Sequence, residues 1–117
     1  MTINNVLMLS KLLENKKNDI VNVTTAYKFS KILSFFSSDL NFFKEKYNEL
    51  INLYKEDNSN NEEIKIKPEH INIFNNKVNE LLEIKVEDCP TKIKIEELNN
   101  FKLTLEESNI LFPFIIE

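Results

Sequence analysis

Residues 24–54 read TTAYKFSKILSFFSSDLNFFKEKYNELINLY, and the spacing of the apolar residues in this stretch decides the fold. They recur at alternating intervals of three and four residues, which places them on one face of an α-helix and could not line one face of a strand. We therefore predict one continuous helix of about eight turns from Thr24 to Tyr54. Its apolar stripe must pack against other parts of the chain or against a partner. The stripe consists of Ala26, Phe29, Leu33, Phe36, Leu40, Phe43, Tyr47, Leu50 and Tyr54.

The size and composition of the chain are those of one small globular domain. It has 117 residues, of which 42% are hydrophobic and 29% are charged, proportions that are ordinary for a soluble protein. This length is enough for one modest core and too short for two. We expect a single domain over residues 1–117.

Two residue types are missing, and each absence excludes a class of site. The chain contains no glycine, which rules out the phosphate-binding loops of nucleotide-binding proteins, because those loops need glycine for close backbone approach. All 15 basic residues are lysine, so no guanidinium is present to pair with guanine or phosphate in a bidentate manner. The net charge of −4 also opposes non-specific binding to nucleic acid. We expect no direct recognition of duplex nucleic acid.

The single cysteine and the lack of a long apolar run bear on location. One cysteine cannot form an internal disulfide, and no run approaches 18 apolar residues. The segment 1–10 also lacks the basic start and apolar centre of a secretion signal. We therefore expect a cytoplasmic protein that does not enter a membrane.

Two shorter helices are expected on either side of the long one. The first carries apolar residues on one face between Asn4 and Asn15. The second begins at Pro68, a residue suited to a first helical turn, and its apolar residues follow the same periodicity as the long helix. The polar stretch 55–63 would be the exposed loop between the long and the second helix. We predict that the long helix and the helix that begins at Pro68 form an antiparallel hairpin. We identify no internal repeat along the chain.

The last third of the chain alternates between apolar and polar residues, as half-buried strands do. We expect short strands around residues 84–86, 93–95 and 101–105, with residues 63–67 as an additional edge. A Thr104-to-Glu107 capping box predicts a short terminal helix that Pro113 stops. The predicted fold class is thus α+β, mainly α: a long central helix in an antiparallel helical hairpin, with a small antiparallel β-sheet and a short terminal helix.

The residues that could carry chemistry favour structural roles. His70 lies at a helix start, where its basicity is lowered, and Cys89 lies beside Glu87 and Asp88, which disfavour a reactive thiolate. One histidine and one cysteine do not make a zinc site. Adjacent carboxylate pairs point apart instead of converging in a pocket. We predict no catalytic residue, no cofactor, no metal and no enzymatic activity.

A protein partner is the remaining expectation. The second helix looks too short to cover eight turns, so part of the aromatic stripe could face a partner or a second copy in a homodimer, although packing within the core is the favoured interpretation. The acidic loop and the apolar C-terminal segment are further candidates. The predicted partner-binding residues are Tyr47, Tyr54, Glu56, Asp57, Glu62, Glu63, Phe112 and Phe114.

The segments AYKFSKIL (26–33), IKIEEL (93–98) and LEESNILFPFI (105–115) give the chain a family resemblance. It resembles small helical proteins encoded by phages and prophages of low-GC bacteria, from about residue 20 onward. The shared motifs are packing patterns, and the absence of glycine from the polar loop is a departure. The resemblance implies a mobile-element origin and a non-enzymatic role, and it supplies no catalytic residues.

Two functional hypotheses follow. The first is a phage-type interaction protein that binds a host protein, in its sharper form an anti-CRISPR-like inhibitor of a bacterial defence system whose acidic face competes with nucleic acid. The second is a virion- or tail-assembly protein or chaperone that works as an oligomer. A small enzyme is a third and weaker alternative, because the chain offers few convergent titratable groups.

Overall fold

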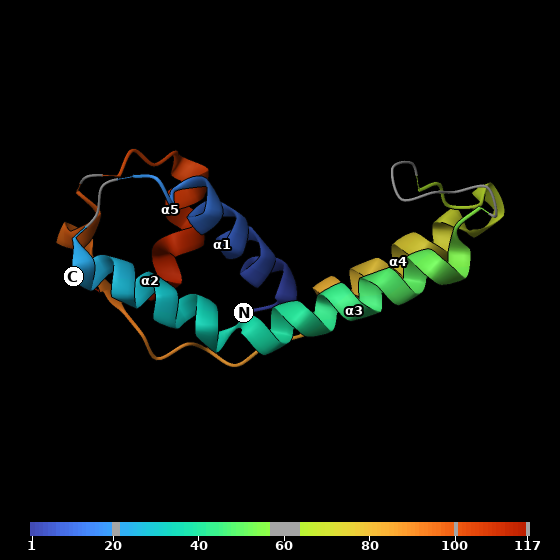
Figure 1. The fold of residues 1–117 in the computed structure, drawn as a ribbon, viewed down its shortest axis with the longest axis horizontal. Helices are drawn as coiled ribbons and strands as arrows, with labels where there is room; N and C mark the ends of the chain where they lie inside the picture. Colours follow the sequence, from blue (N-terminus) through green and yellow to red (C-terminus); the bar gives the residue numbers. More distant parts are fainter. Residues whose placement is uncertain (20–21, 57–63, 100, 117) are drawn as a thin grey trace.

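In a computed structural model, which describes residues 1–19, 22–56, 64–99 and 101–116, the protein consists of a body and a projecting arm. The molecule measures 51 × 27 × 24 Å. Figure 1 shows α1, α2 and α5 gathered in the body at one end, and α3 and α4 running side by side away from it. The helices are α1 (Ile3–Asn15), α2 (Val23–Phe35), α3 (Ser37–Tyr54), α4 (Ile71–Leu82) and α5 (Leu105–Leu111), with short 3₁₀ segments η1 (Pro68–His70), η2 (Ile95–Leu98) and η3 (Phe112–Phe114).

The prediction of one continuous helix from Thr24 to Tyr54 is wrong, because α2 ends at Phe35 and α3 begins at Ser37. The backbone of Phe36 has φ −93° and ψ 4°, and the chain bends there (Figure 1). The Ser37 hydroxyl donates to the carbonyl oxygen of Ser34 at 2.9 Å, a local bond of the kind that competes with helix geometry and accompanies kinks. The Phe36 side chain is fully buried in the body.

The bend divides the apolar stripe between two sets of neighbours. Phe29, Leu33 and Leu40 pack against the core of the body, which is built around α1, the end of α2 and the C-terminal segment. Phe43 and the residues beyond it lie along α4 instead. The fully or largely buried members of this core are Val6, Leu9, Leu12, Leu13, Ile32, Phe36, Cys89, Ile93, Leu98, Leu111 and Phe114.

The hairpin prediction is confirmed for α3 and α4. The ring of Tyr47 lies 6.0 Å from that of Phe74, and the ring of Tyr54 lies 5.4 Å from that of His70, so the two helices run antiparallel. At the far end of the arm, the Lys67 amide donates to the Tyr54 carbonyl oxygen at 2.9 Å. This hydrogen bond joins the end of α3 to the residue that precedes η1.

The sheet differs from the prediction. Its two short strands, β1 (Ile93–Lys94) and β2 (Ile115–Ile116), pair in parallel, so the expected antiparallel sheet is wrong. The apolar alternation in residues 84–86 produces only an isolated antiparallel bridge between Lys85 and Thr2. Residues 101–104 carry no strand, and Ile66 forms an isolated bridge with Lys55. The alternation of apolar and polar residues correctly predicted a strand at β1. It could not identify the strand's partner, which lies 22 positions away in the C-terminal segment.

Two bonds tie the base of the arm to the body. The Ile3 amide donates to the Ile84 carbonyl oxygen at 2.9 Å, and the Val86 amide donates to the Met1 carbonyl oxygen at 3.0 Å. The start of α1 therefore meets the chain as it leaves α4. Within the described residues, none of the helices is long and apolar enough to cross a membrane.

Candidate functional site

A groove of about 470 Å³ runs along one side of the arm, between α3 and α4. On each helix the lining residues are spaced three, four and seven positions apart, so they form one stripe per helix. Leucine and isoleucine form its apolar surface, with the Leu53 side chain 68% exposed. The lining residues are Lys46, Glu49, Leu50 and Leu53 on α3, Lys77, Glu80 and Leu81 on α4, and Ile84 just beyond the end of α4.

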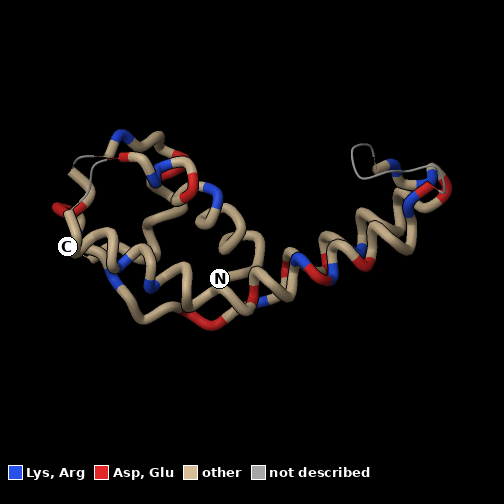
Figure 2. The backbone as a smooth tube through the Cα atoms, in the orientation of Figure 1, with Lys and Arg blue, Asp and Glu red and all other residues tan. Residues whose placement is uncertain are grey.

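Charged residues of both signs flank this groove. Lys46 Nζ lies 3.3 Å from a Glu49 carboxylate oxygen, and Lys77 Nζ lies 3.9 Å from a Glu80 carboxylate oxygen. Lys46 Nζ also lies 5.9 Å from the centroid of the Phe42 ring, on the same stripe. Figure 2 shows lysine and glutamate interleaved along α3 and α4. The groove is therefore apolar along its middle and electrically neutral at its edges.

The seam between the two helices is aromatic and incompletely buried. The rings of Phe43 and Tyr47 stack at 5.6 Å, and Tyr47 contacts Phe74. Phe74 is the buried residue of α4, whereas α3 contains no buried residue in its 18 positions. The arm therefore holds together by one half-buried seam, and outside that seam Phe42, Leu53 and Ile73 are exposed.

The two helices of the arm are an internal repeat that the sequence analysis missed. Segment 40–53 (LNFFKEKYNELINL) and segment 71–84 (INIFNNKVNELLEI) have identical residues at six of 14 positions and an apolar residue in both at five more. Their common apolar periodicity concealed the identities, which appear only when the segments are aligned at an offset of 31. The identical pairs are Asn41/Asn72, Phe43/Phe74, Lys46/Lys77, Asn48/Asn79, Glu49/Glu80 and Leu50/Leu81.

The predicted partner-binding residues do not come together at this groove. Tyr47 and Tyr54 lie in the seam, where they pack against Phe74 and His70. The Glu56 amide, just beyond the end of α3, donates to the Lys65 carbonyl oxygen at 2.7 Å. Asp57, Glu62 and Glu63 lie outside the described residues.

The two predicted phenylalanines of the C-terminal segment have opposite environments. Phe112 is 75% exposed, whereas Phe114 is 2% exposed and sets its ring edge-on to Phe36 at 6.3 Å. Phe114 is thus part of the body's core, and Phe112 is the member that solvent reaches. The groove residues Leu50, Leu53 and Leu81 were absent from the expected set. The repeat was the signal in the sequence that could have pointed to them.

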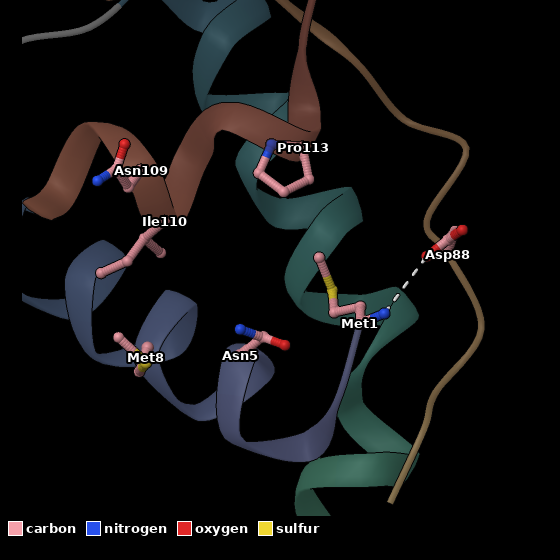
Figure 3. Close-up of a pocket in the computed structure, with 7 residues that line it drawn as sticks. All are labelled: Met1, Asn5, Met8, Asp88, Asn109, Ile110 and Pro113. Carbon is pink, nitrogen blue, oxygen red and sulfur yellow. Dashed lines mark ion pairs between the residues drawn. The ribbon is translucent and has the colours of Figure 1, made fainter. Parts of the chain in front are cut away.

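A second hollow of about 200 Å³ lies in the body between α1 and α5. Figure 3 shows Met8 and Asn5 of α1 on one side of it, Asn109 and Ile110 of α5 on another, and a dashed line between Met1 and Asp88. The Met1 amino group lies 4.0 Å from the Asp88 carboxylate, whose side chain is 88% exposed. The polar groups of this hollow are amides, the Met1 amino group and the solvated Asp88 carboxylate, which do not make the pair of carboxyl groups in contrasting environments that acid–base catalysis uses.

The buried polar contacts of the body have a structural role. The Thr25 hydroxyl, at the start of α2, donates to a Glu97 carboxylate oxygen at 3.0 Å, and Lys28 Nζ donates to the other oxygen. The Lys94 amide donates to the same carboxylate at 3.2 Å. The hydrogen bond from Lys28, assisted by those from Lys94 and Thr25, lowers the pKa of Glu97 against the opposing effect of burial. This cluster fastens α2 to η2.

His70 and Cys89 also lie in packed surroundings. The His70 ring packs against that of Tyr54 at a tilt of 50°, with its Nδ1 atom buried and, among the described residues, without a hydrogen-bond partner. Cys89 is 3% exposed and is a free thiol in the core. No set of three or more His, Cys, Asp or Glu side chains within residues 1–19, 22–56, 64–99 and 101–116 is arranged to hold a metal ion.

Comparison with protein-family models, with curated proteins and with solved structures gave no match to this chain.

Proposed function

We propose that the protein is a small, non-enzymatic interaction protein that binds another protein through the groove on its α3–α4 arm. The observation that carries this proposal is the groove itself: an open apolar surface lined by Leu50, Leu53, Leu81 and Ile84, on an arm that projects from the body. Exposed, contiguous apolar surface costs solubility, so its presence on a projecting element favours a binding role.

The shape of the groove favours a helical ligand. A groove between two antiparallel helices accepts the apolar face of a third helix, whose apolar side chains at every third or fourth residue enter the groove. The lysines and glutamates at its edges would pair with charges of either sign on that helix. The ligand that fits this surface best is therefore an amphipathic helix with leucine or similar aliphatic residues on its apolar face.

The sharper form of the proposal is a phage-type, anti-CRISPR-like inhibitor of a bacterial defence complex. It is supported by the resemblance of segments 26–33, 93–98 and 105–115 to phage-encoded proteins, and by the small size and net charge of −4. Because the charges along the arm are of mixed sign, an apolar contact through the groove explains binding better than imitation of nucleic acid.

A virion- or tail-assembly role is the second candidate. It is favoured by the half-covered arm, since α3 has no buried residue of its own and an assembly partner would complete its burial. Assembly proteins of this kind act as oligomers, whereas an inhibitor acts on a foreign target. The two forms differ in which protein fills the groove.

The binding experiment compares two leucine variants. Leu53 lines the groove, and Leu105 is an 81% exposed leucine of the body. We expect the wild-type protein and Leu105→Glu to capture the same partner from lysate of the source organism, and Leu53→Glu to lose it. Equal capture by all three proteins would contradict binding through the groove.

The inhibitor form has its own measurement. Purified protein is titrated into nuclease effector complexes of the host, and target cleavage is followed at saturating concentration. Inhibition by the wild-type protein that Leu53→Glu weakens at least tenfold supports it. Undiminished cleavage with every effector refutes the inhibitor form and leaves assembly as the proposed role.

A further inference from the structure

We propose that the groove is filled by the α3–α4 arm of a second copy of this chain, so that two arms form an antiparallel four-helix bundle. The inference rests on the proposed function, because it uses the same groove and names its occupant. Burial, symmetry, charge and size each contribute to the argument.

The side chains of the arm are buried only to the extent expected for two helices of a four-helix bundle without the other two. In a four-helix bundle each helix packs against two neighbours, and its apolar stripe is shared between them. In the arm α3 and α4 pack mainly against each other; α3 also contacts α1 and α2, and α4 also contacts α1. Phe74 is the buried residue of α4, while α3 has none. Leu50, Leu53 and Leu81 line the open side. A second arm laid over the groove would supply the missing neighbours.

The repeat gives the arm a local two-fold symmetry. At the groove positions the two segments match closely, because Lys46, Glu49 and Leu50 have identical counterparts at an offset of 31 and Leu53 corresponds to Ile84. The helices run antiparallel and Tyr47 packs against Phe74, so Lys46 and Lys77 lie at nearly the same level. A two-fold axis near these lysines exchanges the two halves of the groove. Homodimers use self-complementary patches related by a two-fold axis, and a surface made of one motif used twice offers the same side chains to either helix of a second arm.

The charges around the groove are compatible with pairing of identical surfaces. Two lysines, Lys46 and Lys77, and two glutamates, Glu49 and Glu80, line it, so its net charge is zero. A stagger of one helical turn between the arms brings lysines opposite glutamates. The repulsion expected from the net charge of −4 on each chain is screened beyond about 8–10 Å in physiological salt.

The size of the arm suits a weak dimer. An 18-residue helix is about 27 Å long, and two helices side by side are about 20 Å wide. One face of the arm therefore offers on the order of 500 Å² per copy, close to the lower end of the range for specific interfaces. We expect dissociation in the micromolar range, so that the dimer forms and separates over accessible concentrations.

The first experiment is sedimentation velocity from about 1 to 500 μM. The wild-type protein should pass from monomer to dimer, and Leu105→Glu should behave in the same way. Leu53→Glu should remain monomeric, because it places a carboxylate in the proposed interface. Leu53 is 68% exposed in one chain, so this variant should keep the wild-type circular dichroism and unfolding midpoint.

Charge reversal provides a second, positive experiment. Lys46→Glu combined with Lys77→Glu makes the groove acidic on both helices, and Glu49→Lys combined with Glu80→Lys makes it basic. Each double variant alone should be monomeric at 500 μM, and an equimolar mixture should form a heterodimer at least tenfold tighter than the wild-type dimer.

Several results overturn the inference. They are a wild-type monomer at 500 μM, a Leu53→Glu protein that dimerises as the wild type does, or a mixture of charge variants that does not associate. A monomer in all cases refutes the second copy as occupant without touching the proposed function, which the capture and cleavage experiments test separately.

Discussion

Phe36 is the residue at which the body and the arm meet. Its side chain is fully buried, its ring lies edge-on to Phe114 at 6.3 Å, and its backbone ends one helix and precedes the next. The neighbouring Phe35 packs its ring at 5.0 Å from that of Phe36 but is 37% exposed. Two adjacent phenylalanines thus have different roles, which the periodicity of the stripe distinguished correctly.

Truncation of these two residues should have unequal effects. We expect Phe36→Ala to reduce the free energy of unfolding by about 3–5 kcal/mol, because it leaves a cavity in a packed core. Phe35→Ala should cost clearly less, because its ring is partly solvated already. Urea unfolding followed by circular dichroism measures both. Similar losses for the two variants would contradict the placement of Phe36 in the core.

Glu97 is a charged residue whose hydrogen bonds hold η2 against α2. It belongs to one of the adjacent carboxylate pairs that we expected to point apart, and it accepts hydrogen bonds from Lys28, Thr25 and Lys94. The sequence could not reveal this role, because the partners on α2 lie about 70 positions away. Glu96, the other member of the pair, is exposed.

The lowered pKa of Glu97 predicts a pH dependence of stability. Lys28 is the main cause of the lowering, so the folded protein binds this proton more weakly than the unfolded chain does. The contribution is fully present above the unfolded pKa of about 4.3 and is lost as pH falls through the lower folded pKa. The difference in urea midpoint between wild type and Glu97→Gln should therefore be large at pH 7 and shrink below about pH 4.

Glu96→Gln is the control for that experiment. It removes an equal charge from the adjacent position, so it should leave the midpoint nearly unchanged throughout the range. A wild-type to Glu97→Gln difference that stays constant from pH 7 to pH 3 would show that the Lys28 contact contributes nothing specific.

Among the elements, α5 has the clearest local signal. Its capping box is formed as the sequence predicts: the Glu107 amide donates to the Thr104 hydroxyl at 3.1 Å, and the Thr104 amide donates to the Glu107 carboxylate at 3.0 Å. These bonds satisfy two amides that the helix itself leaves without partners. Because α5 packs against α1, fraying of its start would loosen the body.

Removal of this cap should be measurable. We expect Thr104→Ala to lower the free energy of unfolding by about 1 kcal/mol, and Thr104→Ser to retain most of the stability because it keeps the hydroxyl. Urea unfolding of the two variants at pH 7 compares them directly. The interpretation of Thr104 as a cap would be wrong if both variants were equally destabilised.

Sequence signals that act within a few residues predict most of the helices, but they predict few of the contacts between segments that are distant in sequence. α1, α4 and α5 were predictable because periodicity, Pro68 and the Thr104 box all act within a few residues. The break at Phe36 was not, since it depends on the burial of one ring in a core that distant segments build. The parallel pairing of Ile93 with Ile115 depends on tertiary structure in the same way.

The molecule as a whole is elongated. Its radius of gyration over Cα atoms is 17.2 Å, whereas a compact domain of this length would have about 13 Å. The difference comes from the arm, which extends away from the body (Figure 1). An arm in that position presents the groove to solvent along its length.

Small-angle X-ray scattering of dilute protein tests this shape. We expect the Leu53→Glu variant to stay monomeric and to give a radius of gyration near 17 Å. A value near 13 Å would mean that the arm folds back on the body in solution. The groove would then be covered by the chain's own residues.

At this scale the candidate site was only partly predictable. The hairpin and an uncovered portion of the stripe followed from the lengths of the two helices, and they pointed to the correct part of the chain. The expected contact residues Tyr47 and Tyr54 are seam residues instead, because the inner half of the stripe is covered by the body and α4 lies along the outer half. The side of the hairpin that stays open depends on how the helices turn relative to each other.

The parallel pair β1–β2 constrains how the protein can form on the ribosome. Ile93 has no strand to join until Ile115 has been synthesised, and the contacts between α1 and α5 likewise await the synthesis of α5. The α3–α4 hairpin consists of nearer neighbours in sequence, and such low contact order favours early formation. We therefore expect pulse-labelled hydrogen exchange to protect α3 and α4 before α1, so that the groove of the arm would be formed in nascent chains while the body is still open.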